Sequence, residues 1–272
     1  MRVAACQMNS RGDKAANLAT ALDLLDEAAA GGADLAVLPE YFDYLGTDEG
    51  ALAAAEPISG PITEAVAARA RRHGLWVLAG SMHARAADGR CTNASLLFDR
   101  EGRIAARYDK LHLFDIGLAG QPSYRESATV EGGERVVTAE IEGLRAGLSV
   151  CYDIRFPELY RLHMLAGARL LLVPAAFTLH TGRAHWELLL RARAVENQCF
   201  VIAAAQVGES VAGRACFGHS MIVDPWGQVL ACRAEGVGIV TTTLDLARQE
   251  ALRAELPALA NRRADVYRLE SG

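Results

Sequence analysis

Short apolar segments alternate with amphipathic stretches along most of this chain. Several of the apolar segments are almost continuously hydrophobic, which is typical of strands covered on both faces. The amphipathic stretches show the period of 3.6 residues that favours helices. The pattern predicts strands at residues 3–8, 35–38, 75–81, 94–98, 104–108, 144–150, 170–173, 200–205, 220–223 and 238–243. It predicts helices at residues 15–30, 60–73, 157–166, 184–197 and 245–256.

Glycine and polar residues separate these elements. Gly31 and Gly32 end the first predicted helix, and residues 99–102 and 224–227 have the composition of hairpin turns. Strands alternating with helices, together with two hairpins, indicate an α/β fold with a mixed sheet and helices outside it. Residues 111–134 are rich in glycine and weakly periodic, so we expect a long loop there, and such loops are often functional. We expect one domain over residues 1–272.

The composition narrows the classes of protein. The 272 residues are 51% hydrophobic and 22% charged, enough for a large core, and the net charge of -5 gives no basic patch for nucleic acid. No apolar run approaches the ~20 residues that cross a bilayer, and the first residues enter a strand without a secretory signal. Six scattered cysteines without a C-x-x-C pair favour a reducing compartment. We therefore expect a cytoplasmic protein without nucleic-acid or membrane partners.

A cysteine lies where an apolar strand turns abruptly polar. Cys151 follows the predicted strand 144–150, and Pro157 begins the next predicted helix. Ligands bind at the carboxyl ends of strands in open α/β folds, and backbone N–H groups at a helix start favour a thiolate or an oxyanion. Cys151 is therefore a candidate nucleophile. The alternative is a small buried hydrophobic residue, the common role of a free cysteine.

Two further ionisable residues follow predicted strands. Glu40 comes after residues 35–38 and Lys110 after residues 104–108, so neighbouring strands would bring both to the thiol. The carboxylate can take the thiol proton, and the ammonium can stabilise a tetrahedral intermediate with the Tyr152 backbone N–H as second donor. Taken singly, Glu40 could be a solvated carboxylate, and Lys110 could pair with Asp109 or Glu101 at the surface.

These motifs resemble those of the nitrilase superfamily of carbon–nitrogen hydrolases, which use a Glu–Lys–Cys triad. The matching segments are residues 38–40 (LPE), 108–113 (YDKLHL) and 150–159 (VCYDIRFPEL). The resemblance implies a four-layer αββα sandwich of the nitrilase type. It also implies an amidase without cofactor or metal that forms a cysteine thioester and releases ammonia. Finally, it implies that Glu126, in the expected loop, positions Lys110 and assists proton transfer at the leaving group.

Residues 176–187, 190–198 and 218–227 resemble the Nit branch of that superfamily. The branch contains amidases that act on deaminated glutathione and ω-amidases that act on compounds such as α-ketoglutaramate. The resemblance implies a small amide substrate, with deaminated glutathione expected. The alternatives are ω-amidase activity or another aliphatic amidase or nitrilase-type hydrolysis. It also implies a homodimer or a higher homo-oligomer.

Other candidate residues come from the same segments. Arg183 stands where the Nit branch usually has proline, and it could anchor a substrate carboxylate or be a solvated surface residue. Phe177 is a candidate for the pocket wall, although aromatic residues in such runs are more often core. Three rival hypotheses remain. The first is a metal hydrolase, but the sequence has no H-E-x-x-H motif. The second is an enzyme in which Cys151 pairs with His185 or His219, and the third is a non-catalytic binding module.

Overall fold

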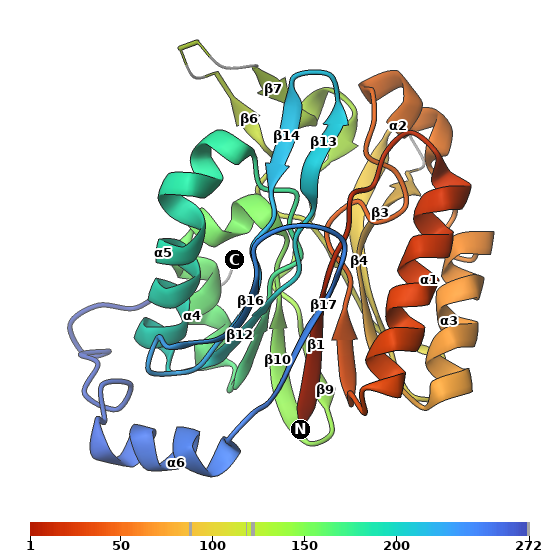
Figure 1. Ribbon diagram of the computed structural model, residues 1–272. Helices are drawn as coiled ribbons and strands as arrows, with labels where there is room; N and C mark the ends of the chain where they lie inside the picture. The colour runs from red at the N-terminus through yellow and green to blue at the C-terminus, as the bar shows by residue number, and fades with distance from the viewer. Residues whose placement is uncertain (87–88, 118, 121–122, 271–272) are drawn as a thin grey trace.

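The computed structural model describes residues 1–86, 89–117, 119–120 and 123–270, and two large sheets pack face to face in it (Figure 1). The first sheet has the strand order β17–β1–β2–β3–β4–β5, with β8 beside β4. β2 is parallel to β1 and β3, and β17, β4 and β5 are antiparallel to their neighbours along this order. The strands are β1 (Arg2–Gln7), β2 (Leu35–Val37), β3 (Trp76–Arg85), β4 (Cys91–Phe98), β5 (Ile104–Asp109), β8 (Val130–Glu131) and β17 (Gly238–Thr243).

The second sheet has the order β16–β15–β12–β11–β10–β9, with β10, β11 and β12 parallel. Its strands are β9 (Thr138–Ile141), β10 (Leu144–Leu148), β11 (Leu170–Leu172), β12 (Phe200–Ala203), β15 (Ser220–Val223) and β16 (Val229–Arg233). Two small antiparallel pairs lie at the top of Figure 1. They are β6 (Asp115–Ile116) with β7 (Tyr124–Arg125), and β13 (Val207–Val211) with β14 (Arg214–Phe217).

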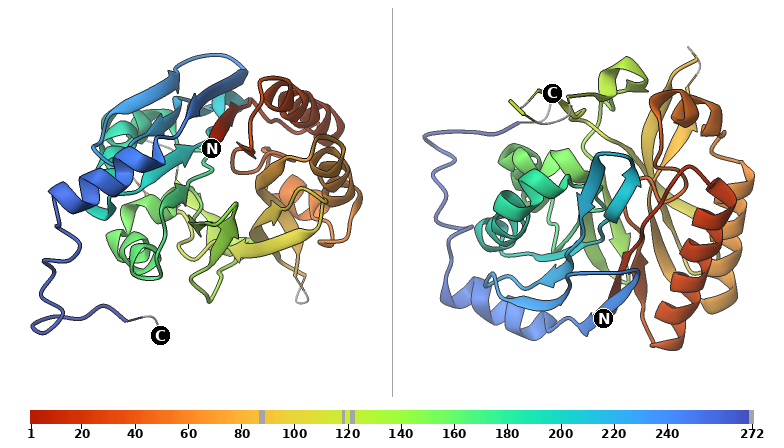
Figure 2. Two further views of the ribbon diagram at one scale, coloured as in Figure 1. Left: turned by 90° about the horizontal axis from the view of Figure 1, so that it is seen from below. Right: turned by 45° about the horizontal axis from the view of Figure 1, so that its top comes forward.

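Helices cover both outer faces of the sheet pair, as the view from below shows (Figure 2). The first sheet is covered by α1 (Lys14–Ala30) and α3 (Pro61–His73), and the second by α4 (Pro157–Leu165) and α5 (Leu179–Asn197). The remaining helical segments are α2 (Asp48–Ala54), α6 (Leu246–Glu255) and the 3₁₀ turns η1 (Glu126–Ala128) and η2 (Cys151–Arg155). The four layers are the αββα sandwich that the resemblance implied. The hydrophobic pattern indicated a mixed sheet with helices outside it, and the structure differs in having two such mixed sheets.

Alternation along the strands explains the layers. Val3 and Ala5 of β1 lie in the core between the two sheets, together with Leu148 of the second sheet. Ala4 and Cys6, which point the other way, lie in a separate apolar cluster with residues of α1 and α3. Both faces of the strand are therefore apolar, as the continuous hydrophobic runs predicted.

Most predicted elements are present, and the differences have local causes. The turns 99–102 and 224–227 join β4 to β5 and β15 to β16, as predicted. Helix α5 begins at Leu179 rather than at residue 184, and Gly182 interrupts the apolar period there. A Cβ on Gly182 would lie 2.3 Å from Phe217 Cβ, so this glycine permits close packing. Helix α2 and strands β9, β13, β14 and β16 were not predicted.

The expected loop at residues 111–134 contains short elements. Strands β6, β7 and β8 and the turn η1 all fall within it, while residues 118 and 121–122 lie outside the described part of the chain. In that described part, the helices are too short or too polar to cross a bilayer. All six cysteines, each within it, are free thiols.

Candidate active site

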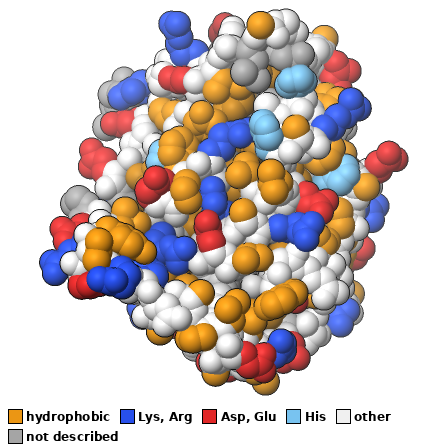
Figure 3. Space-filling model, turned by 90° about the vertical axis from the view of Figure 1, so that its left-hand side faces the viewer, with side chains coloured by type: hydrophobic (Ala, Val, Ile, Leu, Met, Phe, Trp, Pro, Cys, Tyr) orange, Lys and Arg blue, Asp and Glu red, His pale blue; other side chains and the backbone are white. Residues whose placement is uncertain are grey.

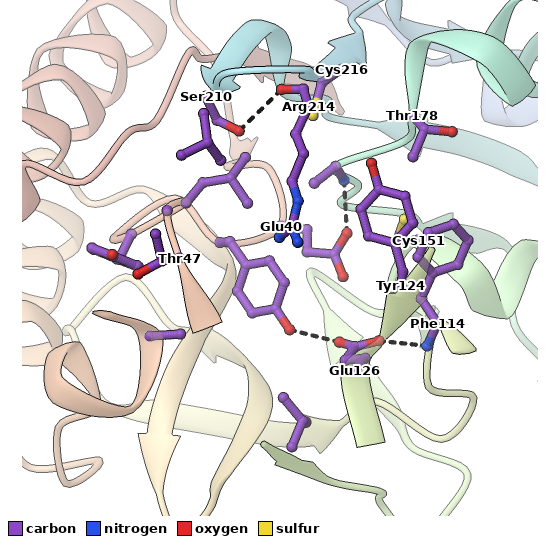
Figure 4. A pocket seen from close by; sticks show the side chains of 18 of the residues that line it. Glu40, Thr47, Phe114, Tyr124, Glu126, Cys151, Thr178, Ser210, Arg214 and Cys216 are labelled. Atoms are coloured by element: carbon purple, nitrogen blue, oxygen red, sulfur yellow. Dashed lines mark hydrogen bonds between the residues drawn. The ribbon is translucent and has the colours of Figure 1, made fainter. Parts of the chain in front are cut away.

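A cavity opens at the end of the sandwich that carries the two small hairpins, and the predicted triad of Glu40, Lys110 and Cys151 lines it. Figure 4 shows Glu40 and Cys151 in this cavity. Glu40 follows β2 and Lys110 follows β5, both in the first sheet, whereas Cys151 follows β10 in the second sheet. The structure therefore brings together three residues that are far apart in the sequence. Each of the three side chains is at most 6% exposed.

The Glu40 carboxylate is held by donors from several segments. Lys110 Nζ and Asn93 Nδ2 each donate to Glu40 Oε1 at 2.9 Å. The backbone N–H of Ala176, which follows β11, donates to Oε2 at 2.7 Å. These three bonds fix the position of the carboxylate, which lies close enough to the thiol to raise the pKa of Cys151.

Lys110 lies between two carboxylates. Its ammonium is 2.9 Å from Glu40 Oε1 and 2.8 Å from Glu126 Oε2. Burial alone would lower the pKa of Lys110, but Glu126 and Glu40 outweigh burial and raise this pKa well above its usual value. The ammonium therefore stays charged throughout the physiological range.

The backbone at Cys151 turns sharply. Its φ angle is +49°, in the left-handed region that non-glycine residues occupy mainly where the surroundings impose it, often at functional sites. Burial and the nearby Glu40 carboxylate raise the pKa of the Cys151 thiol well above its usual value, and Lys110 only partly opposes them. The resting thiol is therefore protonated, and its attack on a substrate requires a base.

Glu126 is a mostly buried member of the cluster and lies beside Lys110, the residue that the resemblance expected it to position. Its side chain is 10% exposed. Oε1 accepts a 2.6 Å hydrogen bond from the Tyr41 hydroxyl, and Oε2 accepts one of the same length from the Phe114 backbone N–H. Burial raises its pKa, but Lys110 and these donors outweigh burial and lower it overall. Glu126 is therefore a second carboxylate that holds the Lys110 ammonium, beside Glu40.

Two residues of this cluster were missed from the sequence. Asn93 Nδ2 bridges the carboxylates, donating to Glu40 Oε1 at 2.9 Å and to Glu126 Oε1 at 3.1 Å. Tyr41 holds Glu126 through its hydroxyl and has a φ angle of +54°. A polar Asn93 within the buried run of β4 was the sequence feature that could have revealed the first residue.

Asp153 fixes the turn that carries the nucleophile. It is fully buried, and its Oδ2 accepts 2.7 Å hydrogen bonds from the Val150 N–H and from the Tyr108 hydroxyl. Its Oδ1 accepts from the His112 backbone N–H at 3.1 Å. Asp153 thus joins the end of β10 to the segment around Lys110, and it connects a strand end of each sheet.

The predicted substrate-binding residues differ in position. Tyr152 follows Cys151 in the first turn of η2, where a backbone N–H lacks a helical acceptor, so it can serve as an oxyanion donor. Phe177 is buried against Trp186, with ring centroids 5.0 Å apart, and is not among the described residues that line the cavity. Arg183 is exposed on α5 and is also absent from those lining residues, so the structure does not bring it to the site.

The alternative Cys–His arrangement has no support in the geometry. Neither His185 nor His219 is among the described residues that line the cavity with Cys151. His185 Nδ1 lies 3.3 Å from Arg155, and the His219 ring stacks on Phe217 at 3.9 Å. Lys110 is likewise engaged with buried carboxylates rather than with Asp109, which pairs with Arg107.

A four-layer sandwich with a buried Glu–Lys–Cys cluster defines a class of enzyme. The chain belongs to the carbon-nitrogen hydrolase family, whose sequence profile matches residues 2–254. The resemblance to the nitrilase superfamily and the expected αββα fold are both confirmed. The protein is thus an enzyme of the amidase type that hydrolyses carbon–nitrogen bonds.

Individual relatives narrow the comparison. The chain is 44% identical to the deaminated glutathione amidase of Bos taurus, spanning 97% of this chain and 83% of that protein. It is 41% identical to the protein of the same name from Synechocystis sp., spanning 95% and 97%. The crystal structure of the Caenorhabditis elegans NitFhit protein matches with a TM-score of 0.93 at 39% identity, covering 98% of this chain and 66% of that chain.

Proposed function

We propose that this enzyme hydrolyses the γ-amide of deaminated glutathione. Family membership and relatives of that name at 41–44% identity support the substrate. The observation that carries the chemistry is the meeting of Glu40, Lys110 and Cys151 in one buried cluster at the cavity. The reaction is metabolite repair, because it removes a damaged form of glutathione.

The first half-reaction forms a thioester. Glu40 takes the proton from the Cys151 thiol as the sulfur attacks the amide carbon, since the raised pKa of the thiol makes a base necessary. The Lys110 ammonium and the Tyr152 backbone N–H stabilise the negative oxygen of the tetrahedral intermediate. Glu40 then returns the proton to the leaving nitrogen, and the carbon–nitrogen bond breaks.

The second half-reaction consumes water. Glu40 removes a proton from a water molecule that attacks the thioester carbon, and the acid product and the Cys151 thiol are released. In deaminated glutathione the amide nitrogen belongs to cysteinylglycine, so this dipeptide is the leaving group. The ammonia release that the resemblance implied therefore applies only to primary amides such as α-ketoglutaramate.

A paired assay tests the proposal. Wild-type enzyme is expected to release cysteinylglycine from deaminated glutathione with a higher kcat/KM than that for ammonia release from α-ketoglutaramate. Cys151→Ala and Cys151→Ser should both lose nearly all turnover, because a serine hydroxyl is far less readily ionised than a thiol. The opposite order of kcat/KM would indicate an ω-amidase. Full activity in Cys151→Ala would overturn the mechanism itself.

We also propose a cytoplasmic location and a homodimer. Six free cysteines fit a reducing compartment. Large apolar side chains on the outer helices of the second sheet, among them Leu188 at 65% exposure, fit burial against a second copy.

A further inference from the structure

An arginine reaches the cavity from the β13–β14 hairpin. Arg214 and Cys216 are two residues apart on β14, so their side chains leave the same face of the strand, and both line the cavity. Figure 4 shows the Arg214 side chain extending from the hairpin into the cavity. Its guanidinium carbon lies 5.3 Å from the centre of the Tyr124 ring of β7, an arrangement that favours one orientation of the cation.

The hairpin is fixed to the catalytic segment. The backbones of Cys216 and Thr178 pair in an isolated antiparallel β-bridge, and the Phe217 N–H donates to the Phe177 carbonyl at 2.8 Å. Thr178 lies two residues after Ala176, whose N–H holds Glu40. The position of Arg214 is therefore tied, through a short stretch of chain, to the position of the base.

The charged residues that line the cavity determine whether it can bind an anionic substrate. Among the described residues that line it, Glu40 and Glu126 are acidic, and Lys110, Arg125 and Arg214 are basic. Lys110 is bound to both carboxylates, so these three groups together carry a charge of -1 and would repel an anionic substrate. Arg214 brings this total to 0 and Arg125 would bring it to +1, so the arginines offset the negative charge that would repel an anionic ligand.

The two arginines differ in direction. Arg125 neighbours Tyr124 on β7, so the two side chains leave opposite faces of the strand, and Arg125 is exposed. Its charge acts on Asp115 of β6, whose pKa it helps to lower after the bonds from Ser127. Arg214 is half-buried and lies over the ring that faces the cavity.

We propose that Arg214 binds a carboxylate of the substrate and thereby selects anionic amides over neutral ones. A guanidinium can pair with a carboxylate through two parallel hydrogen bonds, which gives orientation as well as affinity. This inference rests on the proposed function and refines it. Arg214 takes the role that the sequence suggested for Arg183, which is exposed on α5.

Three amides separate the possible sources of the carboxylate. Deaminated glutathione has carboxylates on both sides of the scissile bond, α-ketoglutaramate has one on the acyl side, and butanamide has none. Arg214→Met should lower kcat/KM for an anionic amide by about 10- to 100-fold while leaving butanamide turnover within about twofold. A loss of kcat/KM with both anionic amides would show that Arg214 binds the acyl-side carboxylate. A loss with deaminated glutathione alone would show that Arg214 binds the carboxylate of the leaving group. Arg214→Lys should recover only part of the loss.

Arg183→Met is the matched control, since it removes an arginine outside the cavity. An effect of Arg183→Met that Arg214→Met lacks would overturn the inference, as would an equal loss with butanamide. Binding provides a test independent of turnover. Glutarate should slow the alkylation of Cys151 by iodoacetamide in the wild type and not in Arg214→Met, as followed by mass spectrometry of the Cys151 peptide. A wild type inactive on both anionic amides would refute the proposed substrate, and equal glutarate protection of both proteins would refute the role of Arg214.

Discussion

Two carboxylates share one ammonium at the centre of the site. Burying Glu40 and Glu126 beside Lys110 costs free energy that the ion pairs alone do not recover, so donors must satisfy the remaining lone pairs. Asn93 and Tyr41 supply such donors together with two backbone N–H groups. The result is a charged cluster whose geometry is set before substrate arrives, as electrostatic catalysis requires.

Glu126→Gln tests the role of the second carboxylate. Glu126 is the charge that contributes most to the raised pKa of Lys110, so its removal should lower that pKa. The Lys110 ammonium would then lose its proton at a lower pH, and the alkaline limb of the profile of kcat/KM against pH should move to lower pH. We expect kcat to fall by roughly 100-fold at pH 7, since the oxyanion donor is less well held.

The matched control is Glu158→Gln, which removes an exposed carboxylate from the first turn of α4. Its pH profile should match that of the wild type. An alkaline limb that stays in place in Glu126→Gln would show that Glu126 does not set the ionisation of Lys110.

For single residues, the sequence predicted the three at strand ends and missed the residues that hydrogen-bond to the site carboxylates. Glu40, Lys110 and Cys151 each follow an apolar run, so their positions at strand ends were predictable. Glu126 was predicted only from the resemblance, because nothing in the sequence of a polar loop indicates that its glutamate will be buried. Tyr41 and Asn93 act through contacts with residues far away in the sequence, and such contacts depend on the packing of two sheets.

Single elements place the nucleophile by close packing. Helix α4 lies against β10, and a Cβ on Gly147 would be 2.4 Å from His163 Cγ. His163 Nε2 lies 3.0 Å from the Leu148 carbonyl oxygen, to which it donates in the neutral ring, and its buried Nδ1 has no hydrogen-bond partner among the described residues. The strand that leads to Cys151 is thus held from outside by a buried, neutral histidine.

His163 predicts a loss of stability in mild acid. Burial lowers its pKa to about 4, from about 6.5 in an unfolded chain. Between these values the unfolded chain binds the proton and the folded protein does not, so the free energy of unfolding is highest above pH 6.5 and decreases as the pH falls toward 4. From pH 7 to pH 5 this histidine should account for roughly 2 kcal/mol of that decrease.

Urea unfolding of wild type and His163→Leu at pH 7 and pH 5 measures this contribution. The variant should lose less stability than the wild type over that interval, by roughly 2 kcal/mol. His180→Gln, which changes an exposed histidine of α5, is the control and should behave as the wild type. Equal losses in wild type and His163→Leu would contradict the prediction.

Element boundaries were predictable where period and capping agree. Helix α1 begins after Asp13, whose side chain accepts from the Ala16 N–H, and it ends at Gly31, so its predicted bounds are nearly those observed. Strands β6, β7 and β8 have two residues each, too few for a period to appear. Their pairing depends on distant partners, as β8 on β4 shows.

The whole site exists only where the two sheets meet. The first sheet supplies Glu40 and Lys110, and the second supplies Cys151 and the Ala176 N–H. Gln206 joins the halves, because its side chain donates to the Glu40 carbonyl at 2.9 Å. Because the active site lies across the interface, its geometry depends on how the two sheets pack against each other. Separation of the sheets would remove the catalytic geometry.

An apolar stripe on α5 is the surface on which we expect the proposed dimer to form. Leu188 and Val195 are seven residues apart, so they lie on one side of the helix, and they are 65% and 49% exposed. Leu165 of α4 is 44% exposed. Figure 3 shows the face of the molecule on the side of α4 and α5, where hydrophobic side chains lie among charged ones. Burial of this stripe against a second copy would fit the dimer that the superfamily resemblance implied.

Leu188→Glu should weaken the proposed dimer. A buried unpaired carboxylate at the interface is expected to raise the dissociation constant more than tenfold, so size-exclusion chromatography with light scattering should show monomer at concentrations where the wild type is dimeric. Leu52→Glu, on α2 at the other side of the sandwich and 37% exposed, should remain dimeric. A monomeric wild type, or a Leu188→Glu protein as dimeric as the wild type, would show that this face of α5 is not the interface.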